Sequence, residues 1–196
     1  MVWVEVETKI KIEDSLASEY REKIRKIARF EKKGKKADDY FAILDGENYP
    51  KKAFRIRAMG DTFEVNFKKW LTNYWTKEVV VKQEFEFVLK GREQVEDLLE
   101  LFRDLGFSEW IKKIKWNETY KWKKDKNISI ELNKIEHLGY FIEIEYLCQP
   151  HKIKIARNKI HKILKELKIK PEQIDNTGYT KMLWYKGTKE KHKFLK

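Results

Sequence analysis

From residue 2 the chain reads Val2-Trp3-Val4-Glu5-Val6-Glu7-Thr8-Lys9-Ile10-Lys11-Ile12, with apolar and charged residues in alternation. Successive side chains of a β-strand point to opposite faces, so Glu5, Glu7 and Lys9 share one face of the predicted strand and valine and isoleucine take the other. Valine and isoleucine also favour extended backbone. The stretch therefore predicts a strand with one apolar and one charged face.

The same pattern returns twice, with Glu84 and Glu86 and with Glu143 and Glu145 set among apolar neighbours. A single strand of this kind is explained by a sheet that has one face in the core and one in water. Three Glu-x-Glu pairs in one chain weaken that explanation. They suggest that the charged faces have a chemical role.

Size and composition indicate one globular domain over residues 1–187, followed by a Lys-rich tail at 188–196. A chain of 196 residues with 41% hydrophobic and 14% aromatic residues can bury a real core. The net charge is +12, from 44 basic and 32 acidic residues, which favours polyanionic partners such as nucleic acid, acidic membranes or phosphorylated small molecules. The abundance of Lys, Glu and Ile suits a thermophile, although AT-rich coding also produces it.

No apolar run is long enough to span a membrane, and we expect a soluble cytoplasmic protein with no membrane partner. Cys148 is the only cysteine, which excludes an internal disulfide and a cysteine-based zinc site. Because it follows an apolar strand, we expect a buried thiol rather than a nucleophile.

Periodicity predicts an α+β protein with about eight strands, connected mostly as a meander, and about three helices. The helices are expected at about 14–30, 92–105 and 152–167, and a short element is expected around 179–185. The Lys-rich run 31–36 is predicted to be a solvated loop. The strands are expected at about 2–12, 39–44, 53–58, 62–70, 77–89, 110–123, 127–135 and 140–147.

The charged faces of these strands carry large sets of both signs. The acids are Glu5, Glu7, Glu84, Glu86, Glu131, Glu143 and Glu145, and the bases are Lys9, Arg55, Arg57, Lys68, Lys82, Lys113 and Lys115. A flat sheet with its charged face in water accommodates them without any ligand. A sheet curled into a barrel encloses them, which is costly unless a ligand neutralises them. Paired carboxylates suit Mg²⁺ or Mn²⁺ and converging Arg and Lys suit phosphate, so a metal–polyphosphate complex would satisfy both sets.

The segment Glu5-Val6-Glu7-Thr8-Lys9 resembles the N-terminal Glu-x-Glu-x-Lys signature of the CYTH superfamily, or triphosphate tunnel metalloenzymes. Class IV adenylyl cyclases and thiamine triphosphatases belong to that superfamily. Later segments resemble the family in the same order: Asp39-Tyr40-Phe41, Arg55-Ile56-Arg57, Phe67-Lys68, Glu84-Phe85-Glu86, Leu105-Gly106-Phe107, Lys113 with Lys115, Leu138-Gly139-Tyr140-Phe141-Ile142-Glu143-Ile144-Glu145, and Gly178-Tyr179-Thr180-Lys181-Met182-Leu183. The resemblance covers nearly the whole chain.

The resemblance implies an eight-stranded antiparallel barrel, a tunnel with a charged interior, that binds a triphosphate with basic side chains and Mg²⁺ or Mn²⁺ with glutamates. The implied metal ligands are Glu5, Glu7, Glu143 and Glu145, with Glu84, Glu86 and Asn133 as further candidates. The implied phosphate contacts are Lys9, Arg55, Arg57, Lys68, Lys113 and Lys115, and Lys82 of the basic set is predicted to join them. Glu5, Glu7 and Lys9 form the expected catalytic set.

The chain departs from the family pattern at three positions that concern this site. The second base of the family's Lys-x-Arg strand appears as Lys115 or is displaced to Asn117. Asn133 stands where the family often has an acid, and Ala42 replaces the acid of the Tyr-Phe-Asp strand. An asparagine carbonyl can still ligate a metal, but it brings no charge.

Several functions stay open at this point. A triphosphate-bearing substrate (ATP, thiamine triphosphate or inorganic triphosphate) can be hydrolysed by water or cyclised by its own ribose hydroxyl. A non-catalytic binder of nucleotide or polyphosphate is the alternative. Nucleic-acid binding is disfavoured because most aromatic residues alternate with charges in strands, where core packing explains them. A homodimer is compatible with the pattern.

Overall fold

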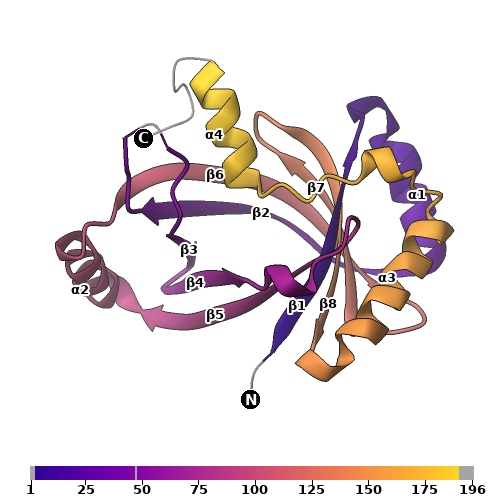
Figure 1. The fold of residues 1–196 in the computed structure, drawn as a ribbon, viewed down its shortest axis with the longest axis horizontal. Helices are drawn as coiled ribbons and strands as arrows, with labels where there is room; N and C mark the ends of the chain where they lie inside the picture. Colours follow the sequence, from indigo (N-terminus) through magenta and orange to yellow (C-terminus); the bar gives the residue numbers. More distant parts are fainter. Residues whose placement is uncertain (1–2, 47, 190–196) are drawn as a thin grey trace. The chain divides into compact units, whose positions relative to one another are not determined.

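The computed structural model describes residues 3–46 and 48–189 (Figure 1). Its strands and helices are β1 (Val4–Ile12), α1 (Ala17–Ile27), β2 (Ala28–Ala42), β3 (Ala53–Met59), β4 (Thr62–Trp70), β5 (Val80–Lys90), α2 (Gly91–Asp104), β6 (Ser108–Trp122), β7 (Ile128–Ile135), β8 (Gly139–Cys148), α3 (Ile153–Glu166) and α4 (Tyr179–Lys189). The strands close into an antiparallel barrel in the order β1-β5-β4-β3-β2-β6-β7-β8. The α+β barrel expected from the sequence is confirmed.

The chain forms two compact units, described separately below. Among the described residues, unit 1 comprises 3–35, 69–84 and 115–177, and unit 2 comprises 36–46, 48–68, 85–114 and 178–189. Within this described part of the chain, none of the helices has the length and apolar character needed to cross a bilayer. The single domain over 1–187 stays a prediction, and most of the predicted tail, 190–196, lies outside the described residues.

Unit 1 is built on the strand with which the sequence analysis began. Strand β1 pairs with β8, and β8 pairs with β7. The apolar faces of these strands meet α1 and α3, and Figure 1 shows α3 lying along β1 and β8. Helix α3 buries Ile153, Ala156, Ile160 and Ile163 in this core, as its periodicity predicts. Both faces of β1 are therefore buried, one by apolar packing and the other by charged groups.

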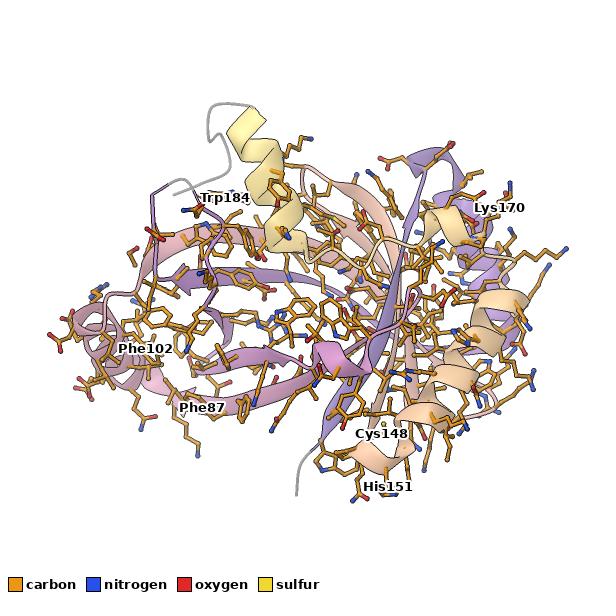
Figure 2. The ribbon with its side chains drawn as sticks, viewed as in Figure 1. Phe87, Phe102, Cys148, His151, Lys170 and Trp184 are labelled. Carbon is orange, nitrogen blue, oxygen red and sulfur yellow. The ribbon has the colours of Figure 1, made fainter. Side chains whose placement is uncertain are left out.

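The ends of β8 show one position that requires glycine and confirm the expected burial of Cys148. Gly139 opens the strand with φ of +87°, and a Cβ there would lie 2.7 Å from Oδ1 of Asp14, so only glycine fits. Cys148 ends the strand as a buried thiol (Figure 2). Burial raises its pKa, as expected for a structural cysteine.

Unit 2 has an aromatic core of its own. Phe54 of β3 stacks on Phe41 and lies 4.4 Å, between ring centroids, from Phe102 of α2, which Figure 2 labels. Trp184 of α4, also labelled there, lies 6.1 Å from the ring of Trp110. These contacts fix α2 and α4 to the strands of their own unit.

Three sequence expectations differ from the observed elements. The run 31–36 belongs to the long strand β2, not to a loop, because ladder hydrogen bonds form whatever the side chains are. Helix α1 consequently ends at Ile27, and Phe30 lies in β2 against Tyr120. The short C-terminal element is a full helix, α4, so the described residues contain four α-helices rather than three.

Candidate active site

Five glutamates from three strands gather in unit 1, and we call them the acidic cluster: Glu5 and Glu7 of β1, Glu131 of β7, and Glu143 and Glu145 of β8. Strand alternation places each pair on one face, and register brings the pairs together. Glu7 is opposite Glu145, and Glu131 is opposite Glu143. Cross-strand neighbours on one face lie close enough for their side chains to interact.

The cluster contains two groups of three carboxylates, Glu5–Glu7–Glu145 and Glu131–Glu143–Glu145, and Glu145 belongs to both. In each group, one oxygen from every residue lies within 4.8 Å of the others. An all-oxygen donor set of this kind suits Mg²⁺ or Mn²⁺. The residues present therefore fit a hard divalent cation.

The electrostatics of the cluster show an excess of negative charge. Burial raises the pKa of Glu145 well above its ordinary value, and the charges of Glu5, Glu131, Glu143 and Glu7 raise it further. A divalent cation would relieve this repulsion and favour the ionised carboxylate.

Three lysines lie among these carboxylates. Lys115 donates to Glu131 at 2.8 Å, Lys9 lies 3.8 Å from Glu143, and Lys82 pairs with Glu7. Burial alone would lower the pKa of Lys115, but Glu131, Glu143 and Glu145 outweigh it and raise that pKa. Lys115 therefore stays charged, and its ammonium group is suited to the phosphate oxygens of a metal-bound substrate.

Neutral amides complete the surroundings of the acidic cluster. Asn133 is fully buried and donates through Nδ2 to Glu143 at 2.7 Å and to Glu131 at 3.3 Å. Its Oδ1 is buried without a hydrogen-bond partner. Asn117 and Thr119 both donate to Glu131 at 3.3 Å. These groups orient the carboxylates, and the Asn133 carbonyl remains a possible ligand.

A segment near the C-terminus fixes Lys9. The backbone N–H of Lys9 donates to Asn176 Oδ1 at 2.9 Å, and its Nζ donates to the Thr177 carbonyl at 3.1 Å. The Asp175 N–H donates to the Lys9 carbonyl at 2.9 Å. The chain after α3 therefore holds β1 at the position of its functional lysine.

Unit 2 contains a second charged group, the basic cluster, formed by Arg55 and Arg57 of β3 and Lys113 of β6 around the carboxylates of Asp38 and Glu64. Arg57 Nε lies 2.6 Å from Asp38 Oδ1, and Lys113 Nζ lies 2.8 Å from Asp38 Oδ2. Arg55 pairs with Glu64, and Arg57 reaches the same carboxylate at 3.2 Å. Three cations thus surround the carboxylates of Asp38 and Glu64, and Arg55 also lies 3.9 Å from the more exposed Glu86.

The basic cluster has the opposite electrostatic character. Asp38 is fully buried, and burial alone would raise its pKa. The charges of Lys113, Arg57 and Arg55 outweigh burial and hold that pKa well below its ordinary value. Surplus positive charge with planar guanidinium groups is suited to phosphate oxygens.

Similarity to known proteins identifies the family of the chain. The family model of the CYTH domain matches residues 4–179. The chain belongs to the CYTH family. The PH1819 protein of Pyrococcus horikoshii is 28% identical, with a TM-score of 0.69 over 93% of this chain and 99% of that one. A protein from Hippeastrum, described as a proposed adenylyl cyclase with a dominant triphosphatase activity, is 17% identical, with a TM-score of 0.63 over 95% and 96% of the two chains. No curated protein matches the chain.

The remaining predicted site residues, Glu84, Glu86 and Lys68, belong to neither the acidic nor the basic cluster. Glu84 is partly buried and Glu86 is exposed, and neither belongs to the carboxylate groups found among the described residues. Glu86 accepts a hydrogen bond from Asn66 at 3.1 Å. Lys68 is partly buried on β4. The predicted metal role of Glu84 and Glu86 and the predicted phosphate role of Lys68 stay predictions.

The sequence analysis did not assign site roles to Asp38, Glu64 or Glu131. Asp38 precedes Tyr40 by two residues and so shares its face of β2, and Tyr40 is opposite Arg55. The same face carries Ala42, so Asp38 provides the acid that Ala42 lacks. Glu131 forms an alternating pair with Asn133, which is the signal that could have identified it.

Proposed function

We propose that this CYTH protein is a divalent-metal-dependent enzyme that acts at phosphorus on a triphosphate-bearing substrate. The observation that carries the proposal is the pair of carboxylate groups joined at Glu145, with Lys9, Lys82 and Lys115 among them. Carboxylates and cations in one buried cluster would both be satisfied by a metal–triphosphate complex. The family and the triphosphatase activity described for the Hippeastrum protein support this assignment.

The acidic and basic residues have different roles in this proposal. The acidic cluster would hold Mg²⁺ or Mn²⁺, with Glu5, Glu7, Glu143 and Glu145 as ligands and Glu131 as an addition to the predicted set. A bound divalent ion neutralises phosphate oxygens and makes a water or hydroxyl group more acidic. Lys9, Lys82 and Lys115, together with Arg55, Arg57 and Lys113 of the basic cluster, would hold the phosphate oxygens and orient them for attack.

Two reactions fit this assignment, and they differ in the attacking group. If water attacks, the enzyme is a triphosphatase; if a ribose hydroxyl attacks, it is an adenylyl cyclase. The structure described as a proposed adenylate cyclase from Vibrio parahaemolyticus has the same fold, at 13% identity and a TM-score of 0.66 over 91% of this chain and 97% of that one. In both reactions the substrate is a small triphosphate compound. The second candidate function is non-catalytic binding of nucleotide or polyphosphate, because Asn133 brings no charge to the metal site.

The first experiment incubates the protein with Mg²⁺ or Mn²⁺ and ATP, GTP, thiamine triphosphate or inorganic triphosphate, and resolves every product. The double variant Glu5→Gln/Glu7→Gln runs in parallel, and Glu96→Gln on the exposed surface of α2 is its matched control. Orthophosphate lost only in the double variant identifies a triphosphatase, and cyclic AMP with pyrophosphate identifies a cyclase. Absence of turnover, with ligands still raising the melting temperature, would leave a binding protein.

A further inference from the structure

Two tryptophans of unit 1 pack together where β4 ends, and we call Trp70 and Trp75 the tryptophan shelf. Their rings meet edge to face with centroids 5.2 Å apart. The Trp75 indole N–H donates to the Val81 carbonyl at 3.1 Å, and the Leu71 N–H donates to the same oxygen at 2.9 Å. The first hydrogen bond fixes the Trp75 ring and the second fixes the backbone next to Trp70, so the shelf is attached to β5.

The shelf is connected to the acidic cluster through one side chain. Lys82 Nζ lies 4.8 Å from the centroid of the Trp70 ring, and the same ammonium group pairs with Glu7. Lys82 is buried, so this cation–π contact is shielded from water. A single lysine therefore separates the shelf from a predicted metal ligand.

The indoles remain substantially open to solvent. Trp70 is 43% exposed and Trp75 is 39% exposed. A large aromatic side chain that is fixed in orientation and left uncovered can stack on another flat ring. Stacking of a base on an aromatic residue is tolerant of base identity because every base presents a π face. Nothing in that contact requires a hydrogen-bonding partner.

We propose that the tryptophan shelf binds the aromatic ring of the substrate. The preferred triphosphate is then one that carries a flat ring, either a nucleobase or the rings of thiamine, and not inorganic triphosphate. The inference rests on the proposed function, because the phosphates must bind at the acidic cluster and its lysines for the ring to reach the shelf. It adds the substrate class that the charged clusters do not specify.

The test measures dissociation constants by titration calorimetry with Mg²⁺ present, under conditions where turnover is negligible. The probes are ATP, GTP, thiamine triphosphate and inorganic triphosphate. We expect at least one ring-bearing compound to bind wild type about 10-fold more tightly than inorganic triphosphate. Trp70→Leu should weaken that compound about 10-fold and inorganic triphosphate by less than about 2-fold. Trp70→Phe keeps a flat ring and should restore most of the preference.

Trp116→Leu is the matched control. Trp116 is 40% exposed and has its own lysine contact, with Lys35 Nζ 5.4 Å from the ring centroid, yet it belongs to neither the shelf nor the acidic cluster. It should alter neither class of ligand. Preference for ATP and GTP alone identifies a nucleobase, and preference for thiamine triphosphate alone identifies thiamine.

Three results would overturn the inference. Inorganic triphosphate could bind wild type as tightly as every ring-bearing compound, which rejects the shelf and leaves the proposed function intact. Trp70→Leu could weaken all triphosphates equally, or it could change the oligomeric state while the ring preference persists, and either result makes the shelf a structural or subunit contact. Failure of wild type to bind inorganic triphosphate and every other probe would reject the proposed function itself.

Discussion

The acidic cluster of unit 1 and the basic cluster of unit 2 each bury charges of both signs, but their carboxylates respond in opposite ways. In the acidic cluster, burial and neighbouring glutamates both raise the pKa of Glu145. In the basic cluster, burial would raise the pKa of Asp38, but Lys113 and the two arginines lower it. Burial raises the pKa of both groups, so the opposite outcomes come from the neighbouring charges, which are glutamates around Glu145 and cations around Asp38. This contrast supports the proposal that the first cluster holds a cation and the second an anion.

The two clusters should also contribute differently to the stability of the folded protein, one without a ligand and the other only with a bound metal. Asp38 is already neutralised by protein groups, so it contributes to the folded state without a ligand. Glu145 is surrounded by like charges, so a bound metal would stabilise its ionised form. Loss of the two carboxylates should therefore change the stability of the metal-free protein in opposite directions.

The largest effect on stability is expected for Asp38→Asn. The variant leaves the buried Lys113 and the partly buried Arg55 and Arg57 with fewer carboxylates, and breaking a buried pair costs about 3–5 kcal/mol. Because the folded-state pKa of Asp38 is lowered from 3.8, its contribution is present above that pH and is lost as the pH falls through the folded-state value. Melting temperatures measured from pH 7 to pH 3 should show the gap between wild type and variant narrowing at the acidic end. Asp39→Asn, at a more exposed neighbouring position, is the control.

A gap that keeps its size below pH 3.8 would show that Asp38 stabilises the unit through shape and hydrogen bonding rather than charge. Manganese affinity provides a second check. Asp38 is not part of the acidic cluster, so Asp38→Asn should leave Mn²⁺ binding close to that of wild type.

The next largest effect is expected for Glu145→Gln and concerns metal affinity. This variant removes the carboxylate shared by both groups of three. We expect Mn²⁺ affinity to fall at least about 100-fold, because loss of even an outer-shell partner costs about 10–100-fold. With chelator present, the melting temperature should instead rise at neutral pH, since one of five crowded carboxylates is gone. Calorimetric titration with Mn²⁺ and thermal unfolding in EDTA give the two values.

Glu136→Gln is the control for this variant, because it makes the same chemical change at a partly exposed glutamate in the turn after β7, outside the acidic cluster. Metal affinity that survives Glu145→Gln would place the ion elsewhere and break the comparison. A lower melting temperature in EDTA would show that Glu145 is structurally paired, as Asp38 is.

The sequence predicted the acidic half of this comparison well because strand periodicity is local. Glu5 and Glu7 share a face by alternation, and so do Glu143 and Glu145, whatever the strands pair with. The pairing of β1 with β8 that joins the two pairs is not local. The family resemblance implied only that the two pairs share a metal site, and the structure adds the register that places Glu7 opposite Glu145.

The basic half was predicted less completely because strand register is not visible in sequence. A shift of one residue moves a side chain to the opposite face, and this is the difference between Asp38 and Asp39. Only the pairing of Tyr40 with Arg55 shows that Asp38 joins the arginines. The full length of strand β2 was not predicted for a related reason. Its Lys-rich half belongs to the sheet through backbone pairing, which the side-chain pattern does not indicate.

The smallest effect on metal affinity is expected for the Glu-x-Glu pair of β5, whose sequence pattern matches the acidic cluster but whose position does not. Glu84 and Glu86 repeat the Glu-x-Glu signature of β1 and β8, yet neither joins a carboxylate group in the described structure. The double variant Glu84→Gln/Glu86→Gln should change Mn²⁺ affinity by less than about 5-fold, in line with the ~0–1 kcal/mol of an exposed charge. The matched variant Glu143→Gln/Glu145→Gln has the same spacing and should abolish binding. Equal losses in both variants would mean that β5 supplies metal ligands after all, and the acidic cluster would then extend over a third Glu-x-Glu strand.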